Sequence, residues 1–152
     1  MMNVAVGFDT SCYTTSAAAV DRQGEVVAFA RKILPVGAGQ RGLRQSEAVF
    51  AHVRQMPQIM QELQQQLANK HAKIDCICAS ASPCDGEDSY MPVFTVGLGH
   101  ARTAAALLNV PLYETTHQRG HIAAGLIGNQ PLPDGHVALH LSGGTTDLLR
   151  VV

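Results

Sequence analysis

Two histidines four residues apart are the side chains of this sequence best suited to hold a metal ion. His117 and His121 belong to the run His-Gln-Arg-Gly-His. On a helix, positions i and i+4 share one face, so both imidazoles can reach the same ion. A zinc protease with this spacing requires a glutamate directly after the first histidine as its general base, and Gln118 stands there instead. We therefore do not expect peptide hydrolysis. The open interpretations are a metal site with a third ligand from elsewhere, or two histidines that only cap the helix.

Two turns rich in small hydroxyl residues are candidates for binding a phosphate group. Asp9-Thr10-Ser11 follows an apolar run, and Ser142-Gly143-Gly144-Thr145 follows another. Backbone amides in such turns can face an anion, and glycine permits the close approach this requires. Asp9 could hold a metal–nucleotide complex, polarise water, or accept hydrogen bonds from the amides of its own turn. The glycine motif alone is equally compatible with an ordinary tight hairpin turn.

A loop and the helix after it carry further candidate anion-binding residues. Residues 34–45 contain three glycines, a proline, Arg41 and Arg44, and His52 follows on the helix. These side chains could meet an anionic substrate or form a solvated face.

Periodic apolar residues define the elements that must position these groups. A long helix with Ser46 as its N-cap places Val49 and Val53 on its apolar face, and Pro57 predicts a kink or a break. Strands are expected at 3–9, 14–21, 25–33, 74–79 and 110–115, and further helices at 93–108 and 116–127. This βββαβαβα order predicts an α/β ribonuclease-H-like lobe with a mixed sheet. We expect the lobe to span residues 1–135 and a first hairpin of a second lobe to span 136–152.

Composition limits the classes of function. The 152 residues are 46% hydrophobic and 15% charged, with a net charge of −1. A strongly basic nucleic-acid surface is therefore not expected, although a local patch or a partner subunit could supply the charge. No apolar run reaches the roughly 18 residues of a membrane helix. Cysteine spacing favours reduced, packed thiols in a cytoplasmic protein.

Four motifs in one order carry a family resemblance. They are Phe8-Asp9-Thr10-Ser11-Cys12, the strand turn before Pro83, the His117–His121 pair and Ser142-Gly143-Gly144. Together they resemble the tRNA N6-adenosine threonylcarbamoyltransferase family, historically called glycoprotease or O-sialoglycoprotein endopeptidase. The resemblance covers essentially the whole chain. It implies a lobe of the actin/hexokinase/heat-shock-chaperone ATPase superfamily.

The resemblance also implies a reaction and a set of ligands. The family transfers a threonylcarbamoyl group from an adenylate to N6 of adenosine 37 in tRNA. His117 and His121 match its metal-binding histidines, which implies divalent iron or zinc, and Asp9 matches an acid of the active site. Threonylcarbamoyl-adenylate or ATP is then expected at the matching segment, which comprises His140, Leu141, Ser142, Gly143, Gly144 and Thr145, together with Ser11.

Several departures make the chain resemble a divergent paralogue and only the N-terminal half of a family member. Tyr13 and Thr14 replace two acids that the family uses, and Thr145 replaces its histidine. A third metal ligand, an aspartate near the far C-terminus of family members, lies outside this sequence. We therefore do not expect this stretch to turn over by itself.

Partners and alternatives follow from the same resemblance. The expected partners are tRNA, through the full-length protein, and a paralogous subunit of a tRNA-modification complex; no membrane is expected. The unpaired edges of the 137–152 hairpin predict self-association of the chain. The alternatives are a non-catalytic scaffold that pairs with the active transferase and a small-molecule kinase of the same superfamily.

Overall fold

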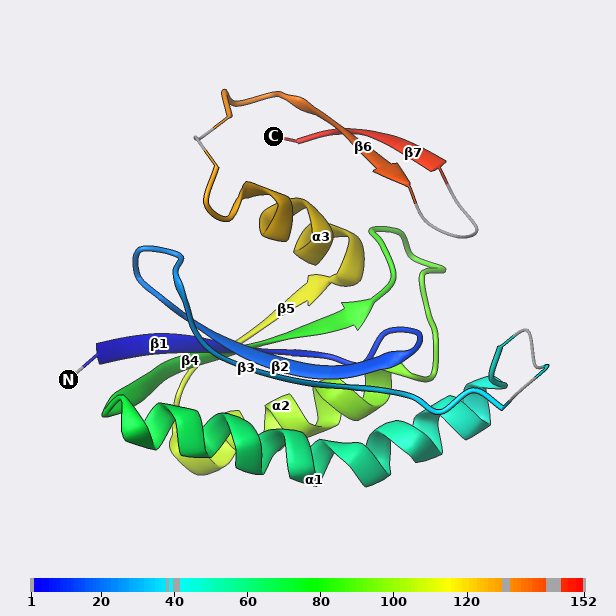
Figure 1. Cartoon of the computed structure of the whole chain (residues 1–152). Coiled ribbons are helices and arrows are strands. Elements are labelled where there is room, and N and C mark those ends of the chain that lie inside the picture. Colours follow the sequence, from blue (N-terminus) through cyan, green and yellow to red (C-terminus); the bar gives the residue numbers. More distant parts are fainter. Residues whose placement is uncertain (1, 38, 40–41, 130–131, 142–145, 152) are drawn as a thin grey trace.

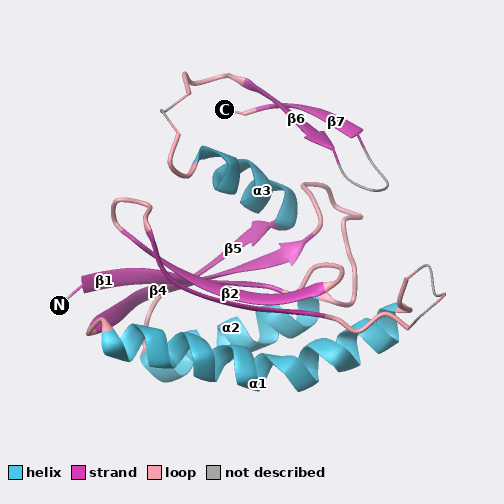
Figure 2. Ribbon diagram, in the orientation of Figure 1, coloured by secondary structure: helices cyan, strands magenta, loops and turns pink. Residues whose placement is uncertain are grey.

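The computed structural model describes residues 2–37, 39, 42–129, 132–141 and 146–151. Five strands form one mixed sheet, two long helices cover one of its faces, and a third helix covers the other (Figures 1 and 2). In chain order the elements are β1 (Met2–Asp9), β2 (Thr14–Asp21), β3 (Val26–Ile33), α1 (Gln45–Asn69), β4 (Ala72–Ser82), α2 (Phe94–Leu108), β5 (Leu112–Thr116), α3 (His117–Leu126), β6 (Val137–Leu141) and β7 (Thr146–Arg150). This is the ribonuclease-H-like order expected from the sequence.

Strand β1 lies at the centre of the sheet, whose order is β3-β2-β1-β4-β5. It pairs antiparallel with β2 and parallel with β4, and β4 pairs parallel with β5. Val4, Val6 and Phe8 are buried on the face that α1 and α2 cover. Successive side chains of a strand point to opposite faces, so Asp9 belongs to the face beneath α3. The strand alternation therefore directs this carboxylate toward the histidines of α3.

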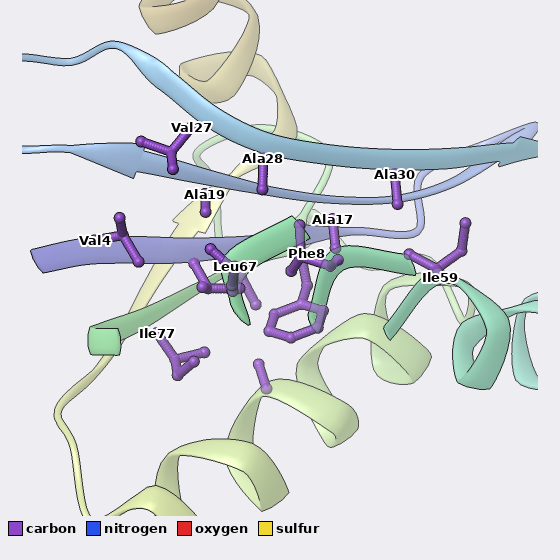
Figure 3. Packing of buried hydrophobic residues seen from close by; sticks show 14 of the residues in the cluster. Val4, Phe8, Ala17, Ala19, Val27, Ala28, Ala30, Ile59, Leu67 and Ile77 are labelled. Carbon is purple, nitrogen blue, oxygen red and sulfur yellow. The ribbon is translucent and has the colours of Figure 1, made fainter. Parts of the chain in front are cut away.

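The core lies between the sheet and helices α1 and α2 (Figure 3). Large side chains from β1 and α1, such as Phe8 and Ile59, fill this layer, and both are at most 2% exposed. Full burial of such a side chain contributes roughly 1.5–3 kcal/mol. Alanines on β2 and β3 face them, which lets the helix approach the sheet closely; these are Ala17, Ala19, Ala28 and Ala30.

Helix α1 differs from the sequence prediction at three points. It runs through Pro57 as one helix, because Met56 and Ile59 on either side of the proline are fully packed in the core and hold the helix together. Its N-cap is Arg44 rather than Ser46, and the Arg44 amide donates to the Glu47 carboxylate over 3.1 Å.

The buried face of α1 is also rotated from the predicted one. Val53 is 48% exposed, whereas its neighbour His52 is fully buried. His52 therefore meets neither an anionic substrate nor solvent, and the prediction for this residue is wrong. Its Nδ1 atom lies 2.8 Å from the Thr15 hydroxyl on β2, and this polar partner makes burial of the imidazole tolerable.

Strand β5 passes directly into helix α3. Thr116 ends the strand and caps the helix, and its hydroxyl accepts a hydrogen bond of 3.2 Å from the Arg119 amide. His117 is therefore the first residue of the helix, at the carboxyl end of a parallel strand.

Strands β6 and β7 form a separate two-stranded sheet over α3 (Figure 1). Gln118 of the helix donates to the Asp147 carboxylate of β7 over 3.1 Å. This hydrogen bond ties the hairpin to the helix that carries both candidate metal ligands.

Candidate functional site

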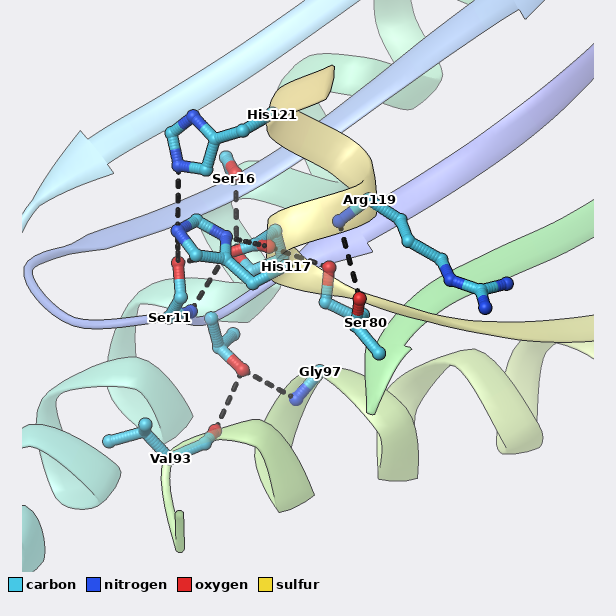
Figure 4. Close-up of polar contacts among 11 residues, drawn as sticks. Ser11, Ser16, Ser80, Val93, Gly97, His117, Arg119 and His121 are labelled. Carbon is cyan, nitrogen blue, oxygen red and sulfur yellow. Dashed lines mark hydrogen bonds and ion pairs between the residues drawn. The ribbon is translucent and has the colours of Figure 1, made fainter. Parts of the chain in front are cut away.

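A polar network at the end of β1 includes Ser11, Ser80 and His117 (Figure 4), and all three contact the carboxylate of Asp9. Its Oδ1 atom accepts hydrogen bonds from the amide and the hydroxyl of Ser11, the former over 2.8 Å. Its Oδ2 atom accepts from the Ser80 hydroxyl over 2.7 Å and lies 2.8 Å from the Nδ1 atom of His117. One side chain thus joins the ends of β1 and β4 to the start of α3.

This network keeps Asp9 ionised. Burial acts to raise the pKa of Asp9, but hydrogen bonds from His117, Ser11 and Ser80 outweigh burial and lower the pKa to about 2. An ionised carboxylate only accepts hydrogen bonds, so in the contact between Asp9 and His117 the proton belongs to Nδ1 of His117. In a neutral imidazole the Nε2 atom then carries a lone pair.

The two helix histidines point their Nε2 atoms at each other. These atoms lie 2.8 Å apart, and the rings meet edge to face with centroids 4.3 Å apart. The pKa of His121 is lowered by burial and then by the neighbouring His117 and His140, which favours a neutral imidazole at neutral pH. Neutral imidazole nitrogens are common ligands of zinc and iron. The donor chemistry therefore fits two ligands of a divalent metal.

The described residues do not place a third protein ligand beside His117 and His121. Across the described ranges, no three histidine, cysteine, aspartate or glutamate side chains already form a group that could hold a metal ion. The pair His117 and His121, oriented by Asp9, is the part of a site that the fold brings together.

The polar side chains of the turn Asp9-Thr10-Ser11 form hydrogen bonds within the protein. Ser11 gives both its amide and its hydroxyl to Asp9, an alternative considered from the sequence, and its Oγ atom lies 3.4 Å from Nε2 of His117. Thr10 is fully buried; it donates to the Val93 carbonyl over 2.7 Å and accepts from the Gly97 amide over 3.0 Å. Thr10 therefore fastens β1 to the start of α2, and adenylate binding by Ser11 stays a prediction.

The second turn is only partly described. His140 lies on β6 with its ring centroid 5.4 Å from that of His121, whereas Leu141 is 67% exposed. Ser142, Gly143, Gly144 and Thr145 lie outside the described residues, as does Arg41. Phosphate binding at this turn stays a prediction.

Tyr13, at a position where the family resemblance implies an acid, contacts the loop before α1. Its backbone carbonyl accepts from the Leu34 amide over 2.7 Å. A Cβ atom added to Gly42 would lie 2.5 Å from the Tyr13 hydroxyl, so the phenol lies directly against the loop backbone.

Two features of the site were missed in the sequence. The strand predicted at 74–79 stops one residue short of Ser80, whereas β4 runs through Ser80 to Ser82 and pairs parallel with β1, which brings Ser80 next to the carboxyl end of β1. A cleft of about 650 Å³ also opens between the sheet and α3. Asp9, Ser80, His117 and His121 belong to its wall, and small residues such as Ala18 line the remainder.

No helix in the described part of the chain is both long enough and apolar enough to cross a membrane.

Comparison with solved structures places the fold. YeaZ from Pseudomonas aeruginosa superposes with a TM-score of 0.53 at 14% identity, over 97% of this chain and 65% of that one. An uncharacterized protein with similarity to peptidase YEAZ from Pseudomonas aeruginosa gives a TM-score of 0.57 at 13% identity, over 97% and 64% of the two chains. At these identities the likeness concerns the fold alone, and it agrees with the ribonuclease-H-like order of elements described above.

Sequence comparison gives the family. The family model for tRNA N6-adenosine threonylcarbamoyltransferase matches residues 37–152. The transferase of Synechococcus sp. (strain CC9902) is 30% identical over 155 residues, which cover 99% of this chain and 42% of the relative. That of Burkholderia lata is 28% identical over 149 residues, which cover 97% and 42%. The chain thus spans less than half the length of these curated relatives. Because the family model matches well over half of its residues, this chain belongs to the tRNA N6-adenosine threonylcarbamoyltransferase family.

Proposed function

We propose that this chain supplies the metal-binding side of a transferase that places threonylcarbamoyl on N6 of adenosine 37 of tRNA. The observation that carries the proposal is the row of contacts from Asp9 to His117 and from His117 to His121, called the Asp9–His117–His121 relay below. Asp9 contacts Nδ1 of His117, and proteins commonly orient an imidazole ligand of a metal by such a carboxylate on its other ring nitrogen. The Nε2 atom of His117 then faces the Nε2 atom of His121.

Each residue of the relay has a distinct role in this proposal. His117 and His121 hold a divalent iron or zinc ion, and Asp9 fixes the tautomer and orientation of His117. Ser80 and Ser11 hold the carboxylate in place and keep it ionised. The bound metal would act as a Lewis acid toward the transferred group or its phosphate.

The adenylate and the tRNA belong to the wider assembly. In the proposal, residues 1–135 form one lobe, and residues 136–152 form the first hairpin of a second lobe. The segment from His140 to Thr145 then binds threonylcarbamoyl-adenylate or ATP between the lobes. Recognition of tRNA falls to the full-length protein and a paralogous subunit, consistent with the net charge of −1 on this chain.

Analysis of tRNA nucleosides tests the activity. A strain that lacks the full-length gene is complemented with the wild type, His121→Ala or His100→Ala, and threonylcarbamoyladenosine is measured by mass spectrometry. His100 lies on α2, away from the relay, and serves as the matched control. We expect the modification with the wild type and the control and its loss with His121→Ala. Modification that does not depend on the gene would overturn the proposal.

A non-catalytic scaffold is the second candidate, and Tyr13 favours it. The Tyr13 side chain is 43% exposed and lies against the Gly42 backbone, where the family resemblance implies an acid. A scaffold would keep the fold and a partner surface without a functioning metal site. Metal analysis of protein purified without chelator separates the two: stoichiometric metal lost in His121→Ala favours the transferase, and no metal in either protein favours the scaffold.

The outer face of the hairpin supports self-association of this chain. Val137, Leu139 and Leu141 on β6 are each more than 60% exposed, and Leu148 on β7 is 74% exposed. An apolar face and open strand edges favour pairing with a second copy. Sedimentation velocity over a hundredfold concentration range is expected to show a concentration-dependent increase in mass. The double variant Leu139→Lys/Leu148→Lys is expected to remain monomeric, and a monomeric wild type at all concentrations would contradict the prediction.

A further inference from the structure

We propose that His52 is a positioning residue for the turn Asp9-Thr10-Ser11-Cys12, which it holds from the core side in a conformation suited to a nucleotide phosphate. The inference rests on the proposed function, in which an adenylate binds between the lobes, and on Ser11 as one of the expected contacts of that adenylate. His52 itself touches no ligand in this proposal, because its side chain is fully buried.

His52 lies on the same face of α1 as two apolar core residues. Met56 follows it by one helical turn and Ile59 by two, and both are at most 1% exposed. An apolar side chain at this position would pack without a polar partner, whereas a buried polar ring is costly unless it is hydrogen-bonded. The imidazole therefore indicates a role that packing alone does not require.

A chain of three hydrogen bonds fixes the tautomer of His52. The Ile33 carbonyl can only accept, so the Gln55 amide nitrogen donates to it over 3.2 Å, and the Gln55 oxygen accepts from the Thr15 hydroxyl over 2.8 Å. A hydroxyl has one proton, so the Thr15 oxygen accepts from Nδ1 of His52 over 2.8 Å. His52 thus joins α1 to the first buried residue of β2.

The imidazole also faces the backbone of the turn. Its Nε2 atom is buried and has no hydrogen-bond partner among the described residues. Burial lowers the pKa of His52, and the backbone of Cys12 opposes that lowering, which places the turn backbone beside the ring. His52 therefore stands between α1 and the turn, with Thr15 on one side and Cys12 on the other.

The turn adopts a conformation that needs support from its surroundings. Cys12 has a φ of 42°, in the left-handed region that residues other than glycine seldom adopt. A strained residue of this kind persists only where the structure around it holds it in place. Left-handed residues are also a common element of the backbone nests that bind anions. Support of Cys12 from the core side therefore bears on how the turn can face a phosphate.

Two fully buried threonines fasten the turn at its two ends. Thr10 is bonded to the Val93 carbonyl and the Gly97 amide at the start of α2. Thr15 is bonded to His52 of α1. The residues between the two threonines are therefore held by both helices that cover the core, and His52 provides the link to α1.

Amide hydrogen exchange of the chain tests the positioning without a ligand. Wild type is compared with His52→Leu, with His52→Asn, which keeps a donor in place of Nδ1, and with Ile59→Val, a core control on the same helix. Exchange of the Ser11 amide is measured relative to the Val6 amide of β1, which reports global unfolding. We expect this relative rate to rise roughly tenfold in His52→Leu and to stay within about threefold of wild type in the other two variants. An unchanged relative rate in His52→Leu overturns the proposal.

Nucleotide affinity of the full-length protein, with ATP as the probe, tests the consequence for binding. Calorimetry is expected to give a roughly tenfold higher Kd for His52→Leu, an unchanged Kd for Ile59→Val and a value near wild type for His52→Asn. Wild-type affinity in His52→Leu would also overturn the proposal. If the wild type itself binds no ATP, the proposed adenylate site fails, and the exchange measurement alone decides whether His52 holds the turn.

Discussion

The Nδ1 atom of His117 lies 2.8 Å from the Oδ2 atom of Asp9, across 108 positions of sequence. The first strand and the third helix of the chain thus meet in one carboxylate–imidazole pair. The pair sets the tautomer of His117 and thereby decides which nitrogen can bind a metal.

Removing the charge of Asp9 is expected to weaken metal binding. In Asp9→Asn the amide no longer enforces the Nδ1–H tautomer, and loss of such a partner typically costs 10–100-fold in affinity. Zn²⁺ affinity measured by chelator competition checks this. Asp85→Asn is the matched control. The exposed Asp85 carboxylate forms an ion pair of 2.9 Å with Arg119, which lies on α3 like His117. Equal affinities in the two variants would contradict the assigned role.

The cap of α3 is expected to influence the metal site without touching it. Thr116→Ala removes the acceptor for the Arg119 amide and should lower the unfolding free energy by about 1 kcal/mol. Because the first turn carries His117, Zn²⁺ affinity should fall as well. Thr103→Ala, at an exposed site on α2, is the control and should change the unfolding free energy by less than about 0.5 kcal/mol. Urea unfolding and the same metal titration measure both quantities, and an unchanged affinity in Thr116→Ala would refute the link.

Two glycines of α2 give a matched pair for packing. A Cβ atom at Gly97 would lie 2.9 Å from Oγ1 of Thr10, whereas a Cβ atom at Gly99 has no neighbour within 4 Å. Gly97→Ala should therefore destabilise the protein by roughly 1–3 kcal/mol, because Thr10 must give up its bonds to α2. Gly99→Ala should be neutral or stabilise it by up to about 1 kcal/mol, as alanine favours a helix. Thermal or urea denaturation decides, and the same sign for both variants would contradict the expectation.

The buried imidazole of His52 predicts a pH-dependent stability. Burial lowers its pKa from the ordinary value of 6.5, an effect that the backbone of Cys12 and the charge of Asp9 only partly oppose. The unfolded state therefore takes up this proton first, and the unfolding free energy should decline as the pH falls below about 6.5 toward the folded-state pKa. His52→Gln should flatten the decline.

Urea unfolding at pH 7.5, 6.5 and 5.5 measures this effect. His100→Gln, at a partly exposed position of α2, shows what removal of a histidine does in itself. The same decline in wild type and His52→Gln would remove His52 as its source.

Local patterns in the sequence predict the elements well because they depend on near neighbours. Strand alternation places Asp9 at the end of β1, and the four-residue spacing places His117 and His121 on one helix face. The partners of Asp9 depend instead on the parallel register of β1 and β4, which sets Ser80 beside it. No local pattern contains that register.

The same limit explains the errors on α1. An apolar pattern indicates that one face of the helix is buried, but it does not fix the rotation of the helix about its axis. In the structure His52 rather than Val53 faces the sheet. Of the kink or break predicted at Pro57, the break does not occur, because Met56 and Ile59 on either side are packed in the core and this packing outweighs one missing helix hydrogen bond. Both outcomes depend on how the side chains of the sheet pack against α1.

The central position of β1 gives the site an order of assembly during synthesis on the ribosome. The nascent chain presents Asp9 before its distant partners, and Ser11, two positions later, is the first residue that can donate a hydrogen bond to its carboxylate. Ser80 emerges 71 residues after Asp9, and His117 only after 108. The carboxylate therefore precedes its imidazole partner by 108 residues of synthesis. In the proposed metal site, the orientation of His117 by Asp9 can arise only once β1 and α3 are both in place.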